Sequence, residues 1–229
     1  MSKAANVVAI DGPSGSGKST ITKIIAKKCN LTYLDTGAMF RAIAFHLSEQ
    51  GITPKDSHRI YDALSSLKFE YNKAKDNLVE IDGVNLTDDI RQHHVSSLAS
   101  TYGQVESIRN FLKEFQRKVA QDKPAILEGR DIGTVVFPNA ILKFFLKADA
   151  RIRAERRVAQ LKEISPDEDF DVESILIDIK KRDYDDENRE IAPLKKAADA
   201  LLVDSTNKTI DEIVELIVQE ISKIPELKS

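Results

Sequence analysis

Residues 12–19 carry three glycines followed by a lysine and a serine, and they begin one residue after an apolar run at residues 7–10. The stretch GPSGSGKS matches G-x-x-x-x-G-K-[ST], in which glycines let successive backbone N–H groups point at one anion. A helix that begins at this loop adds its positive end, Lys18 supplies a charge for the outer phosphates, and the Ser19 hydroxyl can ligate Mg²⁺. The loop therefore predicts bound phosphate, and leaves open whether that phosphate is hydrolysed, transferred or used as a switch.

Arginines near the ends of other expected strands indicate a second anion. Arg130 follows the apolar run at residues 124–127, and open α/β sheets bind ligands at the carboxyl ends of their strands. Arg41 follows the first strand-to-helix turn after the loop, and Arg182 and Arg189 stand beside acidic residues. Two phosphorylated ligands that meet with arginines between them describe phosphoryl transfer, in which fixed cations and exclusion of water provide most of the catalysis.

Other nucleotide-using classes fit the sequence less well. A GTPase-like switch should carry an Asn-Lys-x-Asp motif that reads guanine. That motif is absent, because Asn207-Lys208-Thr209 lacks the aspartate. Residues 126–128 resemble only faintly the acid-ended strand of a motor or pump ATPase, and Gly129-Arg130-Asp131 follows them at once. Two alternatives stay open at this point: a kinase for another small acceptor, and a nucleotide-dependent binding protein that uses the loop as a switch.

The composition is that of a globular protein with a buried core. The chain has 229 residues, of which 41% are hydrophobic and 31% charged, and its net charge of −3 argues against a general nucleic-acid binder. No apolar run approaches the length of a membrane span. The single cysteine, Cys29, fits a reducing compartment. We therefore expect a cytoplasmic protein with no nucleic-acid or membrane partner.

Short apolar runs alternate with segments of helical periodicity, which is typical of an α/β fold with a mostly parallel sheet. Core strands are expected at residues 7–10, 31–34, 124–127, 141–146 and 200–204. Helices are expected from residue 18 onward and at 38–50, 56–67, 93–101, 105–120, 150–162, 172–182 and 210–221. Three strand-like pieces at 68–71, 78–81 and 84–86, the last two joined by Asp82-Gly83, predict a small antiparallel insert.

Four segments together resemble the bacterial cytidylate kinases: DGPSGSGKST, LDTGAMFR, EGRDIGTVVFP and the pattern RDxxDxNRxxAPL at residues 182–194. The resemblance covers essentially the whole chain. It implies one P-loop kinase domain with a three-layer fold and a five-stranded core sheet. The implied parts are a core (1–38, 103–150 and 191–229), a nucleoside-monophosphate-binding subdomain (39–102, with its β insert at 68–86) and a short helical lid with flanking helices (151–190).

The family transfers the γ-phosphate of ATP to CMP and dCMP with Mg²⁺, in pyrimidine nucleotide metabolism, so the resemblance implies a monomeric enzyme with small-molecule substrates. The implied catalytic residues are Lys18, Arg130, Arg189 and Arg41. ATP would be bound by Gly12, Pro13, Ser14, Gly15, Ser16, Gly17, Lys18, Ser19 and Thr20, and by the lid residues Arg153, Arg156 and Arg157. CMP would be bound by Thr36, Arg41, Ser100, Arg109, Arg130, Asp131, Arg182, Asp186 and Arg189. Ser19 is the implied Mg²⁺ ligand, with water and phosphate completing the shell.

Within the CMP set, the resemblance assigns the acceptor phosphate or the transferring group to Arg41, Arg130 and Arg189. It assigns the cytosine to Ser100, Arg109 and Asp131, and the sugar and its surroundings to Arg182 and Asp186. The chain departs from the family's usual residues at Thr36, where serine is common, and at Glu128, where aspartate is common. Tyr184-Asp185 interrupts a stretch that can be more basic, so the roles of Asp183, Asp185 and Asp186 stay open.

Overall fold

The computed structural model describes residues 5–74 and 77–227, which divide into two compact units. The first unit combines the residues up to 34 with those from 120 onward, and the second unit is residues 35–119. The second unit is longer at both ends than the subdomain expected at residues 39–102, since it also holds the helix at 106–119 that was assigned to the core.

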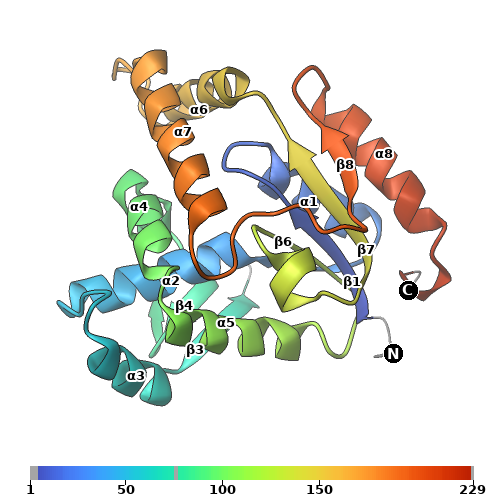
Figure 1. The fold of residues 1–229 in the computed structure, drawn as a ribbon. Helices are drawn as coiled ribbons and strands as arrows, with labels where there is room; N and C mark the ends of the chain where they lie inside the picture. Colours follow the sequence, from blue (N-terminus) through green and yellow to red (C-terminus); the bar gives the residue numbers. More distant parts are fainter. Residues whose placement is uncertain (1–4, 75–76, 228–229) are drawn as a thin grey trace. The chain divides into compact units, whose positions relative to one another are not determined.

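The first unit contains the larger sheet and the helices that flank it (Figure 1). Its strands are β1 (Ala5–Asp11), β2 (Thr32–Asp35, at the junction with the second unit), β6 (Ala125–Gly129), β7 (Ala140–Lys147) and β8 (Leu201–Asp204). Its helices are α1 (Lys18–Lys28), α6 (Ala150–Ile164), α7 (Val172–Asn188) and α8 (Ile210–Ser222), with the short helical turns η2 (Ile132–Val136) and η3 (Pro225–Leu227).

Among the described residues this sheet has five strands in the order β2-β6-β1-β7-β8, and β1 pairs in parallel with both β6 and β7. The predicted parallel core sheet is therefore confirmed. The register pairs Asp11 with Gly129, the last residues of β1 and β6. Because parallel strands end at the same edge, the phosphate loop and the Gly129-Arg130 segment leave the sheet side by side.

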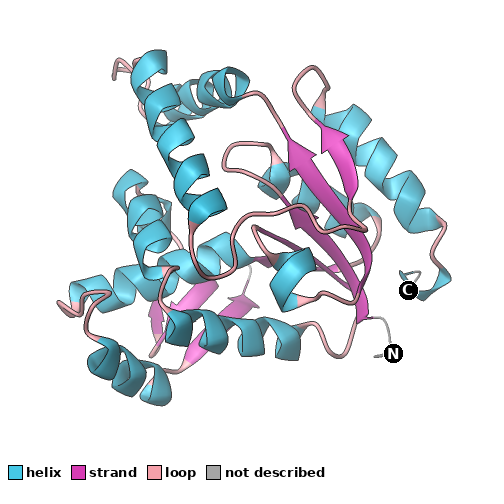
Figure 2. Cartoon of the chain, in the orientation of Figure 1, coloured by secondary structure: helices cyan, strands magenta, loops and turns pink. Residues whose placement is uncertain are grey.

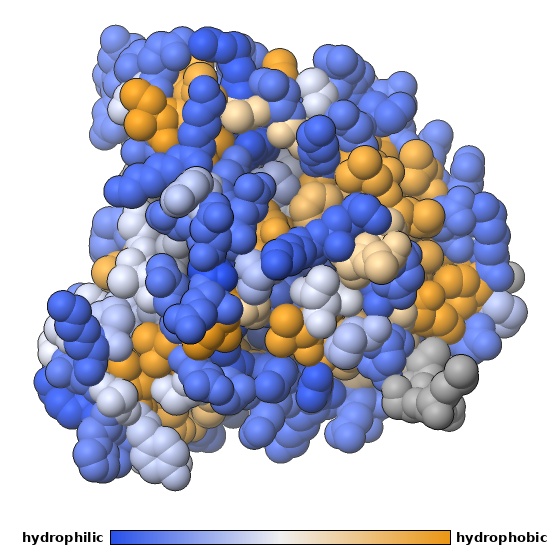
Figure 3. Space-filling model, viewed as in Figure 1, coloured by the Kyte–Doolittle hydropathy of each residue, from blue (hydrophilic) through white to orange (hydrophobic). Residues whose placement is uncertain are grey.

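The main core lies between this sheet and helices α1 and α8, whose apolar stripes face β1 and β7. Fully buried members include Val8, Ile10, Ile21, Ile25, Phe144, Val214 and Ile217. On the right of Figure 3, hydrophobic side chains also gather over β8 and α8, where Leu201, Leu202 and Ile210 are exposed. Among the described residues, none of the helices combines the length and the apolar character that a membrane span requires.

The second unit consists of helices and a small three-stranded sheet (Figure 2). Its elements are α2 (Thr36–Glu49), α3 (Ser57–Ser66), β3 (Phe69–Ala74), β4 (Asn77–Ile81), β5 (Val84–Asn85), η1 (Asp89–Arg91), α4 (His93–Tyr102) and α5 (Glu106–Val119). Both strand pairs are antiparallel, and Asp82-Gly83 turns the chain from Ile81 to Val84. The small antiparallel insert is confirmed in its described part.

One helix is clearly longer than its sequence pattern predicted. The pattern ended a helix at residue 182, whereas α7 continues to Asn188. The C-terminal end of a helix carries partial negative charge, so acidic side chains in its last turns are unfavourable. The four acidic residues within 183–187 therefore disfavour a helix when only the local sequence is considered. In the structure Asp183 and Asp186 each form an ion pair with an arginine from another element, which offsets that penalty. The expectation for this segment was wrong because tertiary partners override the local preference.

Candidate active site

The phosphate loop requires glycine where it leaves β1. A Cβ atom on Gly12 would lie 2.3 Å from the carbonyl oxygen of Leu146 on the neighbouring strand, so no larger residue fits there. Gly17 has a φ of 90° and caps the start of α1, a backbone conformation that glycine adopts without strain. The predicted strand, loop and helix are therefore present, and the loop begins beside β7.

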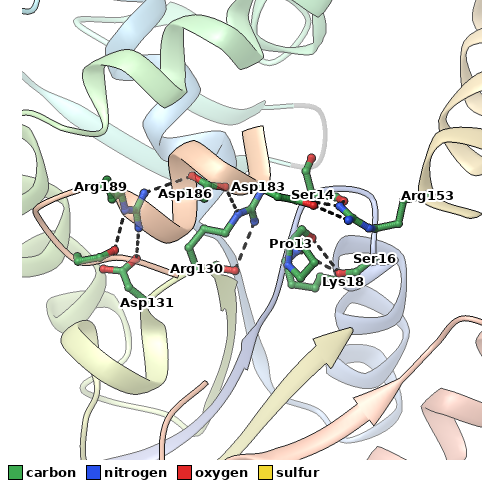
Figure 4. Close-up of polar contacts among 12 residues, drawn as sticks. Pro13, Ser14, Ser16, Lys18, Arg130, Asp131, Arg153, Asp183, Asp186 and Arg189 are labelled. Carbon is green, nitrogen blue, oxygen red and sulfur yellow. Dashed lines mark hydrogen bonds and ion pairs between the residues drawn. The ribbon is translucent and has the colours of Figure 1, made fainter. Parts of the chain in front are cut away.

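Lys18 is buried inside this loop. Its Nζ donates to the carbonyl of Pro13 at 2.6 Å and to Ser16 Oγ at 3.4 Å (Figure 4). Burial lowers the pKa of Lys18 well below its ordinary value, and the nearby Arg130 guanidinium lowers it further, whereas Glu128 and Asp11 oppose the shift. An anion bound in the loop would stabilise the charged lysine, so the site is poised to receive phosphate.

Arg130 follows β6 and lies at the edge of the sheet beside the loop. Its Nε donates to Asp186 Oδ2 at 2.8 Å, and the side chain is 19% exposed. Arg189 lies 3.6 Å from Asp186 Oδ1 and 3.7 Å from Asp131 Oδ1. Figure 4 shows these four side chains grouped next to the phosphate loop. The first unit thus brings together Arg130 and Arg189, which were expected at the phosphate, with Asp131 and Asp186, which were expected at the cytosine and the sugar.

Asp186 is the centre of that group. Burial alone would raise its pKa, but the charge of Arg130 and the hydrogen bond from it, together with Arg182 and Arg189, lower the pKa of Asp186 below its ordinary value. The carboxylate therefore stays ionised and holds the arginines in place. Arg189 is fixed from its other side by the carbonyl of Ala192, which accepts from Nε at 2.7 Å.

Asp11 is a site residue that the sequence pattern did not single out. Its two carboxylate oxygens accept from the backbone N–H groups of Ile132 and Gly133, at 2.9 and 2.8 Å. Asp11 therefore caps the short helix η2, although it lies on a different strand. Burial raises the pKa of Asp11 to about 6, with Asp131 adding to the shift and the two N–H groups and Lys18 opposing it. The position of Asp11, directly before the first loop glycine, was the one available signal.

Ser19 and Glu128 form the oxygen-rich part of the site. Ser19 Oγ donates to Glu128 Oε2 at 2.7 Å, and the Tyr33 hydroxyl donates to Glu128 Oε1 at 2.5 Å. Mg²⁺ prefers oxygen ligands and keeps several waters, so a hydroxyl beside a carboxylate fits that ion. No group of three or more His, Cys, Asp or Glu residues within the described ranges is arranged to hold a metal by itself.

The three lid arginines lie on α6 but differ in their contacts. Arg153 is buried and bonds to Asp183 and to the carbonyl of Ser14, while Arg156 donates to the carbonyl of Ser205 at 2.7 Å. Ser205 in turn donates to the carbonyl of Ser16 at 3.2 Å. Arg157 is half-buried on the same helix. Arg153 and Arg156 are thus both tied to the backbone near the phosphate loop.

The remaining residues assigned to CMP lie in the second unit. Thr36 is buried at the start of α2, and Arg41 lies 3.5 Å from Asp35, which caps that helix. Arg109 is buried, donates to the carbonyl of Gly103 at 2.8 Å and stacks over the ring of Phe40. Ser100 lies on α4. Phe40 was not among the expected residues, although the motif LDTGAMFR contains it.

The structure therefore sorts the expected residues into two sets. The first unit holds the phosphate-loop residues, the three lid arginines, Arg130, Asp131, Arg182, Asp186 and Arg189. The second unit holds Thr36, Arg41, Ser100 and Arg109. Asp131 was grouped with Ser100 and Arg109 for the cytosine, and within the first unit it lies 3.7 Å from Arg189.

Comparisons with known proteins show which family the chain resembles. The family model for cytidylate kinase matches residues 8–223. A cytidylate kinase of Clostridium tetani is 45% identical over 211 residues, which cover 92% of this chain and 91% of that protein. Another, from Fusobacterium nucleatum, is 43% identical over 218 residues and covers 95% and 98% of the two chains. The chain belongs to the cytidylate kinase family.

Proposed function

We propose that the chain transfers the γ-phosphoryl group of ATP to CMP and dCMP, giving CDP or dCDP plus ADP. The observation that carries the proposal is the register of β1 and β6, which pairs Asp11 with Gly129. It places the phosphate loop, the donor half of the site, beside Arg130. A loop alone supports binding or hydrolysis, whereas a second group of arginines beside the loop supports transfer to another phosphate.

Lys18 and Arg130 would stabilise the transition state from the protein's side. Phosphoryl transfer spreads negative charge over the moving group, and preorganised cations in a site that excludes water act on that charge most strongly. The pKa of Lys18 is lowered by burial and by the nearby Arg130. The negative charge of ATP would oppose both effects and favour the charged lysine. No general base is required, because the acceptor oxygen belongs to a phosphate.

The acceptor would be held by charged groups of known geometry. We assign its phosphate to Arg130 and Arg189, and its sugar to Arg182 and Asp186. The Asp186 carboxylate holds both phosphate-binding arginines, since Oδ2 lies 2.8 Å from Arg130 Nε and Oδ1 lies 3.6 Å from Arg189 Nη1. From the second unit, Thr36, Arg41, Ser100 and Arg109 are assigned to CMP on the strength of the family motifs, with Arg109 and Ser100 reading the base. The stacking of Arg109 on Phe40 supports a preorganised guanidinium there.

Magnesium belongs to the same proposal. The Ser19 hydroxyl and the Glu128 carboxylate are the oxygen donors that would hold it, directly or through water, together with the phosphates of ATP. When bound, Mg²⁺ neutralises charge on the β- and γ-phosphates. The enzyme would act as a monomer in the cytoplasm, on small-molecule substrates alone; sedimentation equilibrium tests the oligomeric state.

A panel of acceptors tests the function. The chain is incubated with Mg-ATP and, in separate reactions, with CMP, dCMP, UMP, AMP or GMP, and ADP production is followed. Turnover is expected to be fastest with CMP or dCMP. Activity only on UMP, AMP or GMP would reject the cytidine assignment in favour of another monophosphate kinase, and ATP binding without acceptor-dependent turnover would favour a nucleotide-binding switch.

A further inference from the structure

Arg153 of helix α6 is almost fully buried, at 3% exposed, and touches three different parts of the first unit. Its Nη1 donates to the carbonyl of Ser14 in the phosphate loop at 3.0 Å. The same guanidinium forms a two-point ion pair with Asp183 of α7, through Nη1 at 3.0 Å and through Nη2. Its Nε donates to the carbonyl of Ala148 at 3.1 Å. One side chain thus joins the phosphate loop, α7 and the segment before α6, and Figure 4 shows its contact with Ser14.

These contacts use most of the hydrogen-bonding capacity of Arg153. A guanidinium has five N–H donors and no acceptor. Among the described residues, Nε makes one bond, Nη1 makes two and Nη2 makes one. One donor on Nη2 is left for any other partner. In this arrangement Arg153 is built to hold protein groups together, and has little capacity to clamp a nucleotide.

The contact with Ser14 sets the direction of a loop peptide. In a planar trans peptide the carbonyl of one residue and the N–H of the next point in opposite directions. Since the carbonyl of Ser14 points at Arg153, the N–H of Gly15 points away from it. The backbone passes close to the arginine, because a Cβ atom on Gly15 would lie 3.4 Å from the Cβ of Arg153. Arg153 therefore fixes one of the N–H groups that a phosphate loop uses.

Asp183 connects this arginine to the transfer arginines. It lies three residues before Asp186 on α7, so the two carboxylates share one face of the helix. Asp183 holds Arg153, and Asp186 accepts from Arg130 at 2.8 Å. Helices α6 and α7 also share a small apolar cluster that includes Ala154, Leu176 and Ile179. The two helices are thus packed together, and α7 contacts both halves of the transfer site.

We propose that Asp183, through its ion pair with Arg153, is a positioning residue that couples the shape of the phosphate loop to the placement of Arg130 by α7. This inference rests on the proposed function in one respect, namely that CMP is the acceptor. On this proposal Asp183 acts through Arg153 and α7 and binds neither substrate. Through Arg153 it keeps the Ser14 carbonyl pointing away from the bound phosphate. It also holds α7 in the position from which Asp186 accepts a hydrogen bond from Arg130.

The alternative role for Arg153, as an ATP ligand, predicts the opposite effect of one substitution. If Asp183 merely competes with ATP for Arg153, then Asp183→Asn releases the arginine and ATP binds more tightly. If the pair positions the loop, Asp183→Asn loosens the loop and ATP binds more weakly. The sign of the change in the dissociation constant of ATP therefore separates the two roles.

The experiment measures Mg-ATP binding by titration calorimetry without any acceptor, and then kcat with CMP, for the unmodified chain, Asp183→Asn, Arg153→Gln and the double variant. We expect ATP affinity to fall about tenfold and kcat about a hundredfold in each, since misplacement by about 1 Å reduces rates by that order. The double variant should match the single variants within about twofold, because the two residues act as a unit. Asp183→Glu should recover part of both losses.

Asp185→Asn is the matched control, because Asp185 lies on the same helix with an exposed side chain, and it should change neither quantity. If Asp183→Asn lowers the melting temperature too far for titration, the Asp183→Glu and Arg153→Lys variants give the same comparison. Tighter or unchanged ATP binding in the Asp183 variants overturns the proposal. Failure of the proposed function gives a different result from failure of this proposal: the unmodified chain then binds ATP but does not phosphorylate CMP.

Discussion

The Ser19 hydroxyl donates a 2.7 Å hydrogen bond to Glu128 Oε2, which joins the phosphate loop to the end of β6. The two residues are 109 positions apart in the chain. Both supply oxygen atoms of the kind that Mg²⁺ binds, and Tyr33 holds the other carboxylate oxygen. The finding gives a physical reason to expect the metal between the loop and this strand end.

Ser19→Ala removes the hydroxyl without changing the size of the loop. We expect the affinity for a divalent ion to fall about tenfold or more, as for other changes in and around a metal's ligands. Binding of Mn²⁺ in the presence of ATP, followed by electron paramagnetic resonance, measures this independently of turnover. Ser222→Ala, an exposed serine at the end of α8, is the control. Equal Mn²⁺ affinity in Ser19→Ala and the control would place the metal elsewhere.

The raised pKa of Asp11 predicts that the free energy of unfolding depends on pH. Its pKa is about 6 in the folded chain, against an ordinary value of 3.8, so the folded state binds more protons between these values. The stabilising contribution is fully present below about pH 4 and is lost as the pH rises through 6. Over that window the free energy of unfolding should fall by about 3 kcal/mol, since one pKa unit corresponds to about 1.4 kcal/mol.

Asp11→Asn isolates this effect. The amide does not titrate, so the difference in unfolding free energy between the unmodified chain and the variant should change with pH across that window. Urea unfolding at pH 4, 5, 6 and 7 measures it. The charged groups that act on Asp11 are Asp131 and Lys18, and both chains share them. A difference that stays constant from pH 4 to pH 7 would show that Asp11 is ionised throughout.

The sequence predicted the parts of the site that lie close together in the chain. The phosphate loop, the strand before Arg130 and the Asp82-Gly83 hairpin all have local signatures, and each is present. The parallel sheet followed from the alternation of strands and helices. Even the side-by-side placement of the loop and Arg130 followed from the rule that strand ends meet at one edge of a sheet.

Pairings between distant side chains could not be predicted in the same way. With 31% charged residues, each arginine has many possible acids, and the pairing of Arg153 with Asp183 depends on how α6 packs against α7. The capping of η2 by Asp11 spans 121 residues to Ile132 and leaves no periodic pattern. Such contacts are set by tertiary packing and backbone geometry, which local propensity does not encode.

The stack of Arg109 on Phe40 predicts an effect on the acceptor alone. The guanidinium lies 5.3 Å from the ring centroid, and a cation–π contact contributes about 0.5–2 kcal/mol. Phe40→Leu should therefore raise the KM for CMP about twofold to thirtyfold and leave the KM for ATP unchanged. Steady-state kinetics with each substrate varied in turn measures both constants.

Phe111→Leu provides the comparison for that substitution, because Phe111 packs edge-on against Phe69 in the same unit. It should lower the melting temperature with little change in either KM. If Phe40→Leu and Phe111→Leu alter the KM for CMP equally, the effect comes from general loosening of residues 35–119, and Arg109 has no special role.

Arg130 tests the central claim most directly, namely that a second cationic group beside the phosphate loop makes this a transfer site. In Arg130→Ala the kcat for CMP phosphorylation should fall by about two to three orders of magnitude, as when one electrostatic donor is removed from a transition state. ATP affinity, measured by calorimetry, should change little. Arg151→Ala, an exposed arginine on α6 paired with Glu173, should keep full activity. An Arg130→Ala chain that turns over CMP at the unmodified rate would contradict the account.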